Sequence, residues 1–179
     1  MRTRDPVALA LAASLGASVA LLAGAHIFEA LGYHPCDLCL DQREAHWTAA
    51  AVAAAGLIAA RLIRASTAAV AAVGATAFVY ALSAGLAFYH TGVEFGYWTA
   101  SSCGASVPSG VTAEYFRSVL EDGGPEGGCS EAAWRFFGVS MAGYNLLFSA
   151  GLCLVCLSAA LISTRRLRAP VDEGPRYAG

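Results

Sequence analysis

The stretch FFGVSMAGYNLLFSAGLCLVCLSAALIST, residues 136–164, contains no charged residue and is longer than the about 20 apolar residues that a helix needs to cross a bilayer. Residues 6–28 and 65–89 are apolar stretches of the same kind, without Asp, Glu, Lys or Arg. A fourth stretch, residues 45–60, is shorter and rich in Ala. It reaches spanning length only if the arginines that follow it extend their side chains to the far interface. We therefore expect four transmembrane helices, at about 7–28, 45–63, 66–89 and 140–163.

The composition indicates a chain that sits in lipid. Its 179 residues leave room for one domain, and hydrophobic residues make up 57% of them. Charged residues make up only 13%, whereas soluble domains carry about 25%. The net charge of −2 argues against nucleic acid as a partner, because phosphate binding needs a basic surface.

The basic residues, all of them Arg, are distributed unevenly about the expected spans. Eight lie on one side of a four-pass topology, namely Arg2, Arg4, Arg61, Arg64, Arg165, Arg166, Arg168 and Arg176. The other side has Arg43, Arg117 and Arg135. The positive-inside rule therefore predicts cytoplasmic N- and C-termini and two outward-facing loops, at about 29–44 and 90–139. The expected fold is an all-α membrane protein, an antiparallel bundle of four transmembrane helices.

The N-terminal apolar stretch has an alternative interpretation as a cleaved signal peptide. Arg2 and Arg4 resemble the charged start of such a peptide, and residues 23–25 resemble its cleavage site. The apolar run is longer than is usual for a signal peptide, and further spans follow it. In either case the cysteines of the two loops face outward.

The first outer loop carries Cys36 and Cys39 as a C-x-x-C pair, next to the expected start of the second helix. At a helix start, the backbone N–H groups and the helix dipole stabilise a thiolate. Arg43 follows Cys39 by four residues, which puts both on one helical face and places the guanidinium to hold an anion beside the sulfur. Dithiol redox chemistry explains this pattern better than a static disulfide or a zinc site completed by His34 and His46.

The second outer loop is long and rich in Gly, Ser and Pro. Apolar residues between positions 111 and 120 share one face at helical spacing, which predicts a short amphipathic helix lying on the bilayer surface. A Gly-rich stretch, residues 123–128, precedes Cys129 and allows that residue to move. Cys103 and Cys129 could simply tie down this loop, and closing a ring of about 26 residues would add roughly 3 kcal/mol. The other cysteine pair in the first loop favours a redox role instead.

Two more pairs of reactive residues have ordinary structural interpretations. Cys153 and Cys156 lie in the middle of the last span, where a thiolate is costly and Cys acts as a small hydrophobic residue. We expect them to be packing residues. His90 and Glu94 lie one helical turn apart at the outer end of the third span, where they suit an interfacial hydrogen-bonded pair.

Three segments resemble the disulfide-bond formation protein B (DsbB) family. They are PCDLCLDQR at residues 35–43, YHTGVEFGYW at residues 89–98 and WRFFGVSMAGYN at residues 134–145. The resemblance also includes Cys103 and Cys129, and it follows most of the chain in the right order. Four matched cysteines together with the matched Arg make it specific, although any one motif alone would be weak.

The resemblance implies a relay of disulfides that ends at a quinone. Cys103 and Cys129 form the disulfide that oxidises a periplasmic thioredoxin-like dithiol protein (DsbA-like), with Cys103 taking the mixed disulfide. Cys36 and Cys39 form a second redox-active disulfide. Cys129 passes electrons to Cys36 through a transient disulfide between the two loops. Cys39 is then left as the thiolate that faces ubiquinone or menaquinone.

The family also implies the surroundings of this relay. Arg43 binds the quinone oxygen, and His90 is a second candidate quinone contact. The expected enzyme is a protein-dithiol:quinone oxidoreductase of the bacterial inner membrane, with its cysteines facing the periplasm. Its partners are the DsbA-like protein, the quinone pool and membrane lipid, and no metal is expected.

Three alternatives remain open on the sequence. One is a non-catalytic scaffold of four spans with two structural disulfides. Another is a metal-binding membrane protein that uses His34, Cys36, Cys39 and His46. The last is a redox protein of the same kind that runs in reverse or serves one dedicated substrate.

Overall fold

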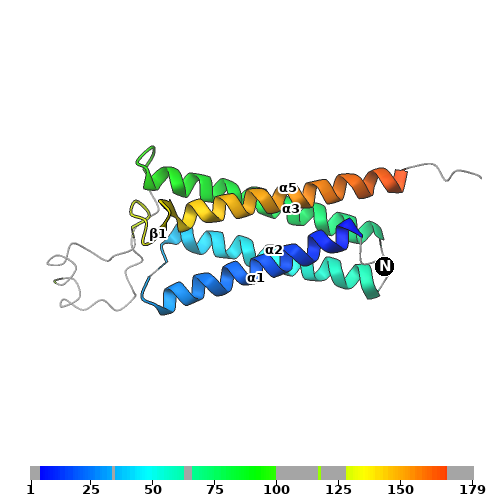
Figure 1. Cartoon of the computed structure of the whole chain (residues 1–179), viewed down its shortest axis with the longest axis horizontal. Helices are drawn as coiled ribbons and strands as arrows, with labels where there is room; N and C mark the ends of the chain where they lie inside the picture. Colours follow the sequence, from blue (N-terminus) through cyan, green and yellow to red (C-terminus); the bar gives the residue numbers. More distant parts are fainter. Residues whose placement is uncertain (1–4, 34, 63–65, 100–116, 118–127, 169–179) are drawn as a thin grey trace, which may run out of the picture.

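The computed structural model describes residues 5–33, 35–62, 66–99, 117 and 128–168. The elements in chain order are α1 (Pro6–Ala30), α2 (Asp37–Leu62), α3 (Ser66–Glu94), β1 (Arg135–Phe136), β2 (Val139–Ser140) and α5 (Met141–Arg168). The four helices lie side by side, and each runs opposite to the one before it (Figure 1). The expected helical architecture is therefore confirmed for the described part of the chain.

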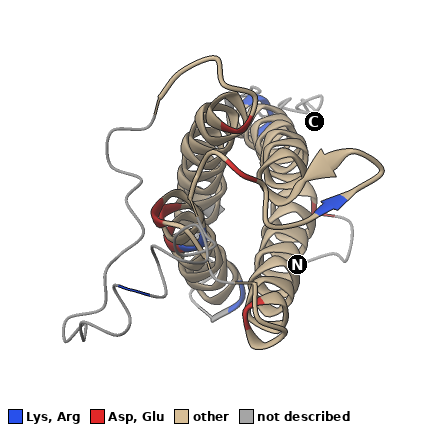
Figure 2. Ribbon diagram, turned by 90° about the vertical axis from the view of Figure 1, so that its left-hand side faces the viewer, with Lys and Arg blue, Asp and Glu red and all other residues tan. Residues whose placement is uncertain are grey.

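Three of the described helices are long and apolar enough to cross a membrane. These are the helical stretches Pro6–Ala30, Thr67–Glu94 and Met141–Leu167. Helix α2 is not among them, and that helix opens with four charged residues in its first eight positions. Its role as a fourth span stays a prediction. The charged residues of the four helices lie near helix ends. Most of the ribbon is uncharged (Figure 2).

The helix ends follow from short local signals. The Asp5 carboxylate accepts a hydrogen bond from the Val7 N–H at 3.0 Å and caps α1, with Pro6 as the first helical residue. Gly32, with φ of 99°, follows the end of α1, and Gly96, with φ of 73°, follows the end of α3. Left-handed backbone of this kind suits glycine and terminates helices.

A small hairpin, β1 and β2, precedes α5 and was not anticipated from the sequence. Its turn residues, Phe137 and Gly138, both have positive φ, 47° and 79°. Two residues in that conformation make the turn that fits the twist of a two-residue hairpin. Ser140 ends the hairpin, and its Oγ accepts a hydrogen bond from the Gly143 N–H at 3.1 Å, which caps α5.

Small residues bring the helices together. Helix α2 packs between α1 and α3, and α5 packs against α3 and α1. The core contains Leu11, Val73 and Tyr80, with buried alanines supplied largely by α2 and α3. Gly56 marks a close approach of α2 to α3, because a Cβ there would lie 2.6 Å from the Cβ of Ala72. Large apolar side chains on the other faces of the helices are exposed, as contact with lipid requires.

Several expectations fall on residues that the structure does not describe. Cys103 and His34 are among them. The same is true of the amphipathic helix expected between positions 111 and 120, apart from Arg117. These expectations therefore stay predictions.

Candidate functional site

The pair Cys36 and Cys39 lies at the N-terminus of α2. Cys36 directly precedes the helix, Cys39 lies in its first turn, and the Cys36 carbonyl accepts a hydrogen bond from the Leu40 N–H at 3.1 Å. Both residues are free thiols with their Sγ atoms 2.9 Å apart. The helix start therefore supports a negative charge on this pair, as the spacing of the two cysteines predicted.

The two sulfurs differ in how readily they ionise. Cys36 donates a hydrogen bond to Cys39, and this bond, together with burial, raises the pKa of Cys36 well above its ordinary value. The same hydrogen bond lowers the pKa of Cys39, against the opposing effect of burial. A backbone hydrogen bond from Cys36 and the positive charge of Arg43 lower the Cys39 pKa further. Cys39 is therefore the sulfur of the reduced pair that ionises more readily.

Arg43 is held across the gap between two helices. Its Nη1 donates to Glu29 Oε2 at 2.6 Å, and its Nη2 donates to the Ala25 carbonyl at 3.2 Å, both on α1. The side chain is 15% exposed, so the guanidinium is partly shielded from water. These contacts fix a cation one helical turn after Cys39, where the sequence predicted it.

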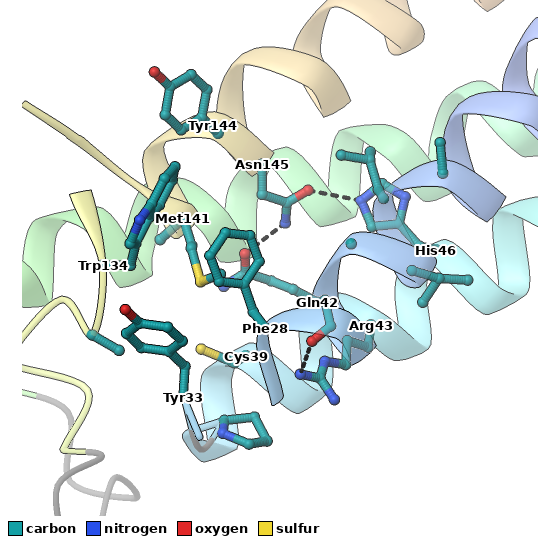
Figure 3. A pocket seen from close by; sticks show the side chains of 18 of the residues that line it. Phe28, Tyr33, Cys39, Gln42, Arg43, His46, Trp134, Met141, Tyr144 and Asn145 are labelled. Carbon is teal, nitrogen blue, oxygen red and sulfur yellow. Dashed lines mark hydrogen bonds between the residues drawn. The ribbon is translucent and has the colours of Figure 1, made fainter. Parts of the chain in front are cut away.

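A cavity of about 390 Å³ lies beside Cys39, between α1, α2, α5 and the hairpin. Aromatic rings of Phe28, Tyr33 and Trp134 line it, as Figure 3 shows. Its polar lining residues are Cys39, Gln42, Arg43, His46 and Asn145. A mostly apolar hollow of this size with a few polar groups is typical of a small-molecule site.

His90 lies behind the thiol pair instead of in the lining of this cavity. It is buried, with its Nε2 at 3.6 Å from Cys36 Sγ and 3.9 Å from Glu94 Oε1. The expected His90–Glu94 pair is therefore close, and it is in contact with Cys36. A quinone contact by His90 stays a prediction, since the cavity beside Cys39 is not lined by this residue.

Three polar side chains link the far side of His90 to the interior of the bundle. Gln42 Nε2 donates to His90 Nδ1 at 2.9 Å, and Asn145 Nδ2 donates to Gln42 Oε1 at 2.5 Å. His46 Nε2 lies 2.7 Å from Asn145 Oδ1 (Figure 3). Sequence reasoning did not assign Gln42 or Asn145 to the site. An Asn inside a long apolar span is a usable signal, because polar residues in lipid rarely lack a function.

Cys129 joins the first pair in one apolar cluster. Its side chain is 1% exposed and packs with Leu38 and Val93, against Cys36 and Trp98. Cys129 is disulfide-bonded. The structure therefore brings a disulfide-bonded sulfur from the second loop close to the thiol pair of the first.

Cys156 lies away from the thiol pair, among the residues of the bundle core. Cys156 is buried in the core, 3.2 Å from Ser14 Oγ, as expected of a packing residue.

The ligand atoms of Cys36, Cys39 and His90 lie within 4.8 Å of one another, which is compact enough for a metal ion. However, His90 Nδ1 accepts a hydrogen bond from Gln42, which leaves the ring proton on Nε2, the atom that would have to bind the metal.

Comparison with known proteins identifies the family. The family model described as "Disulfide bond formation protein DsbB" matches residues 7–159. No curated protein and no solved structure matches the chain. The matched range covers most of the chain, which therefore belongs to the DsbB family. Membership implies disulfide-bond formation by thiol oxidation, and the three long apolar helices agree with a membrane protein.

Proposed function

We propose that this member of the DsbB family oxidises a periplasmic, DsbA-like dithiol protein by disulfide exchange and passes the electrons to membrane ubiquinone or menaquinone. One observation carries the proposal: Cys39, a thiol with a lowered pKa, and Arg43, a fixed cation, line the same apolar cavity. A quinone is a flat apolar ring with two carbonyl oxygens. The aromatic and polar lining of this cavity fits such a ring.

The thiol steps use two disulfides in turn. A thiolate of the partner attacks Cys103 and breaks the Cys103–Cys129 bond, and the second partner thiolate then closes the partner's own disulfide and releases Cys103. Two electrons have now moved onto Cys103 and Cys129, and two protons balance them. Cys129 next attacks Cys36, and Cys39 leaves as a thiolate. Cys103 then re-forms its bond with Cys129 and releases Cys36.

The arrangement of the sulfurs supports this order. A disulfide-bonded Cys129 packed against Cys36, with Cys36 and Cys39 both free thiols, is the state that such an exchange leaves behind.

The quinone steps take place on the other side of Cys39. When bound, the quinone accepts two electrons and two protons. Arg43 would donate hydrogen bonds to a quinone oxygen and stabilise the negative charge that grows there, as oxyanion donors do. Phe28, Tyr33 and Trp134 would hold the ring and exclude water. As electrons leave Cys39, the bond between Cys36 and Cys39 re-forms and the pair is ready for another cycle.

The membrane orientation is part of the same proposal. The hairpin lies at the same end of the bundle as the start of α2 (Figure 1), where Cys36 and Cys39 are found. The opposite end carries Arg61, Arg165, Arg166 and Arg168. The positive-inside rule then puts the arginine-rich end in the cytoplasm and the cysteines in the periplasm of the inner membrane, with α2 as the fourth span.

The test is anaerobic stopped-flow absorbance of the purified protein in detergent, with a ubiquinone analogue and a reduced dithiol partner. Wild type should form quinol in proportion to the dithiol consumed. Cys39→Ser should abolish quinol formation, and Arg43→Ala should raise the quinone KM by about tenfold, the effect of losing about 1.4 kcal/mol of binding. Cys153→Ser and Arg165→Ala are the matched controls and should behave as wild type. Full turnover by Cys39→Ser would rule the proposal out.

A further inference from the structure

A chain of hydrogen bonds reaches the thiol pair from inside the bundle, and its direction is fixed at one point. Gln42 Nε2 donates both to the Leu38 carbonyl at 3.1 Å and to His90 Nδ1 at 2.9 Å. A carbonyl only accepts, so turning the Gln42 amide over would set its oxygen against the oxygen of Leu38. His90 Nδ1 must therefore accept, and the neutral ring carries its proton on Nε2.

The remainder of the chain has the same direction. Asn145 Nδ2 donates to Gln42 Oε1, which keeps the Gln42 amide from rotating. Asn145 Oδ1 accepts from His46 Nε2 at 2.7 Å and from Ser149 Oγ at 3.1 Å, which in turn keeps the Asn145 amide in place. Every donor from His46 onward thus faces toward His90. Gln42 and His46 are buried, so water does not compete for these bonds.

The other edge of the His90 ring faces acidic groups. Cys36 Sγ and Glu94 Oε1 lie 3.6 Å and 3.9 Å from Nε2, and Cys39 lies next to Cys36. The Glu94 side chain is 3% exposed, and its Oε2 has no hydrogen-bond partner among the described residues. A second proton on the ring would have to sit on Nδ1, directed at the N–H group of Gln42. The amide therefore offers no acceptor for a proton on Nδ1.

We propose that Gln42, oriented by Asn145 and His46, is a positioning residue that keeps His90 neutral with its proton on Nε2, so that the negative charge of the reduced pair stays on Cys39. This rests on the proposed function, because Cys39 is the sulfur that faces the cavity. An imidazolium at His90 would stabilise a thiolate on Cys36, as it does in cysteine–histidine pairs. The charge would then lie on the sulfur away from the cavity.

The first test is nitrogen NMR of the full-length, reduced protein in detergent, labelled with ¹⁵N-histidine and without quinone or partner. The ring signals of His90 are assigned by their loss in His90→Asn. In wild type the Nδ1 signal should be that of an unprotonated nitrogen. In Gln42→Glu a carboxylate of the same shape faces Nδ1, so the Nδ1 signal should become that of a protonated nitrogen. A protonated Nδ1 in wild type, or an unprotonated one in Gln42→Glu, would overturn the proposal.

The second test follows where the charge sits. Limited alkylation by iodoacetamide near neutral pH, read by peptide mass mapping, gives the labelling rates of Cys39 and Cys36. Wild type should label Cys39 faster by at least about tenfold, the ratio that corresponds to one pKa unit. Gln42→Glu should reduce that ratio about tenfold or invert it. Thr76→Val removes a buried hydroxyl that lies outside the chain of hydrogen bonds, and it should leave the ratio unchanged.

A second variant tests whether the effect of Gln42→Glu comes from altered packing at position 42. Asn145 does not itself contact His90, but the carboxylate in Asn145→Asp would repel Gln42 Oε1. This repulsion favours turning the Gln42 amide over, against the opposing effect of the Leu38 carbonyl, so that its oxygen faces Nδ1. The NMR signal and the labelling ratio should therefore change in the same sense as in Gln42→Glu. An unchanged ratio in both variants would contradict the proposal. Since neither measurement uses quinone, failure here would leave the quinol assay untouched, and failure of that assay would not alter these readings.

Discussion

The Arg43 guanidinium donates to the Glu29 carboxylate at 2.6 Å and so ties the cation of α2 to the end of α1. The cavity beside Cys39 lies between these two helices and α5. The position of the cation in the cavity therefore depends on how α1 packs, and the residues around Cys39 alone do not fix it. Glu29 is 42% exposed, so the pair contributes little to overall stability, and its main effect is on geometry.

Glu29→Gln should weaken quinone binding without preventing turnover. The neutral amide holds Arg43 less firmly, and an exposed pair of this kind contributes about 1 kcal/mol or less, so the quinone KM should rise by a few-fold at most. The kcat should stay close to that of wild type. Glu44→Gln makes the same change of charge at an exposed position of α2 and serves as the control. A drop in kcat with an unchanged KM would show that Glu29 acts in another way.

Cys36→Ala should make Cys39 less reactive at neutral pH. In wild type the hydrogen bond from Cys36 is the largest cause of the lowered Cys39 pKa, so Cys39 stays a thiolate at pH values below its ordinary pKa of 9.0. Without that bond the pKa rises, and the thiolate is lost as the pH falls from alkaline to neutral. Alkylation rates of Cys39 measured from pH 5 to pH 10 should show the midpoint move to higher pH.

The same titration contains its own check. Cys36 has a raised pKa, so in Cys39→Ala the remaining thiol loses the acceptor that holds its proton. Its labelling midpoint should then fall toward the ordinary range, the opposite direction to that of Cys39. If each remaining cysteine kept its wild-type labelling midpoint in the two single variants, the two sulfurs would not share a proton.

The sequence predicted those parts of the fold and the site that depend only on the length and the period of a single helix. Apolar runs of spanning length predicted α1, α3 and α5, because lipid leaves few alternatives to a helix. The placement of Cys39 and Arg43 on one face followed from their spacing of four residues. Both inferences need only the period of one helix, and neither depends on how helices are packed together.

The features that the sequence did not predict depend on contacts between helices. His90 stays a second candidate quinone contact, but its position against Cys36 was not predicted, because that position is set by how α3 packs on α2. The link from Asn145 to Gln42 joins α5 to α2 over a separation of 103 residues. The hairpin was missed for a different reason, because its strands have two residues each, too short to show an alternating pattern.

Trp134 should report quinone binding through its fluorescence. Its ring lines the cavity, lies 5.0 Å from the Phe28 ring and stacks on Phe136 at 5.8 Å. A quinone bound between these rings would quench Trp134 by close contact. Titration with a ubiquinone analogue should therefore quench wild type in a saturable manner, and Trp134→Phe should lose most of that signal. Trp47→Phe, at an exposed position outside the cavity lining, should retain it. Equal quenching in both variants would place the quinone elsewhere.

Gly56→Ala should destabilise the bundle, whereas Gly74→Ala should not. A Cβ at position 56 would lie 2.6 Å from the Ala72 Cβ and 3.0 Å from a Leu11 methyl carbon, so α2 must move away from its neighbours. Overpacking of this kind costs about 1–3 kcal/mol. At position 74 a Cβ meets nothing within 4 Å, and replacing a helical Gly by Ala gains about 0.5–1 kcal/mol. Thermal unfolding in detergent should therefore show a lower Tm for Gly56→Ala and an equal or higher Tm for Gly74→Ala. Equal Tm values would mean that α2 is free to shift, and that the close approach at Gly56 does not set the spacing of the helices.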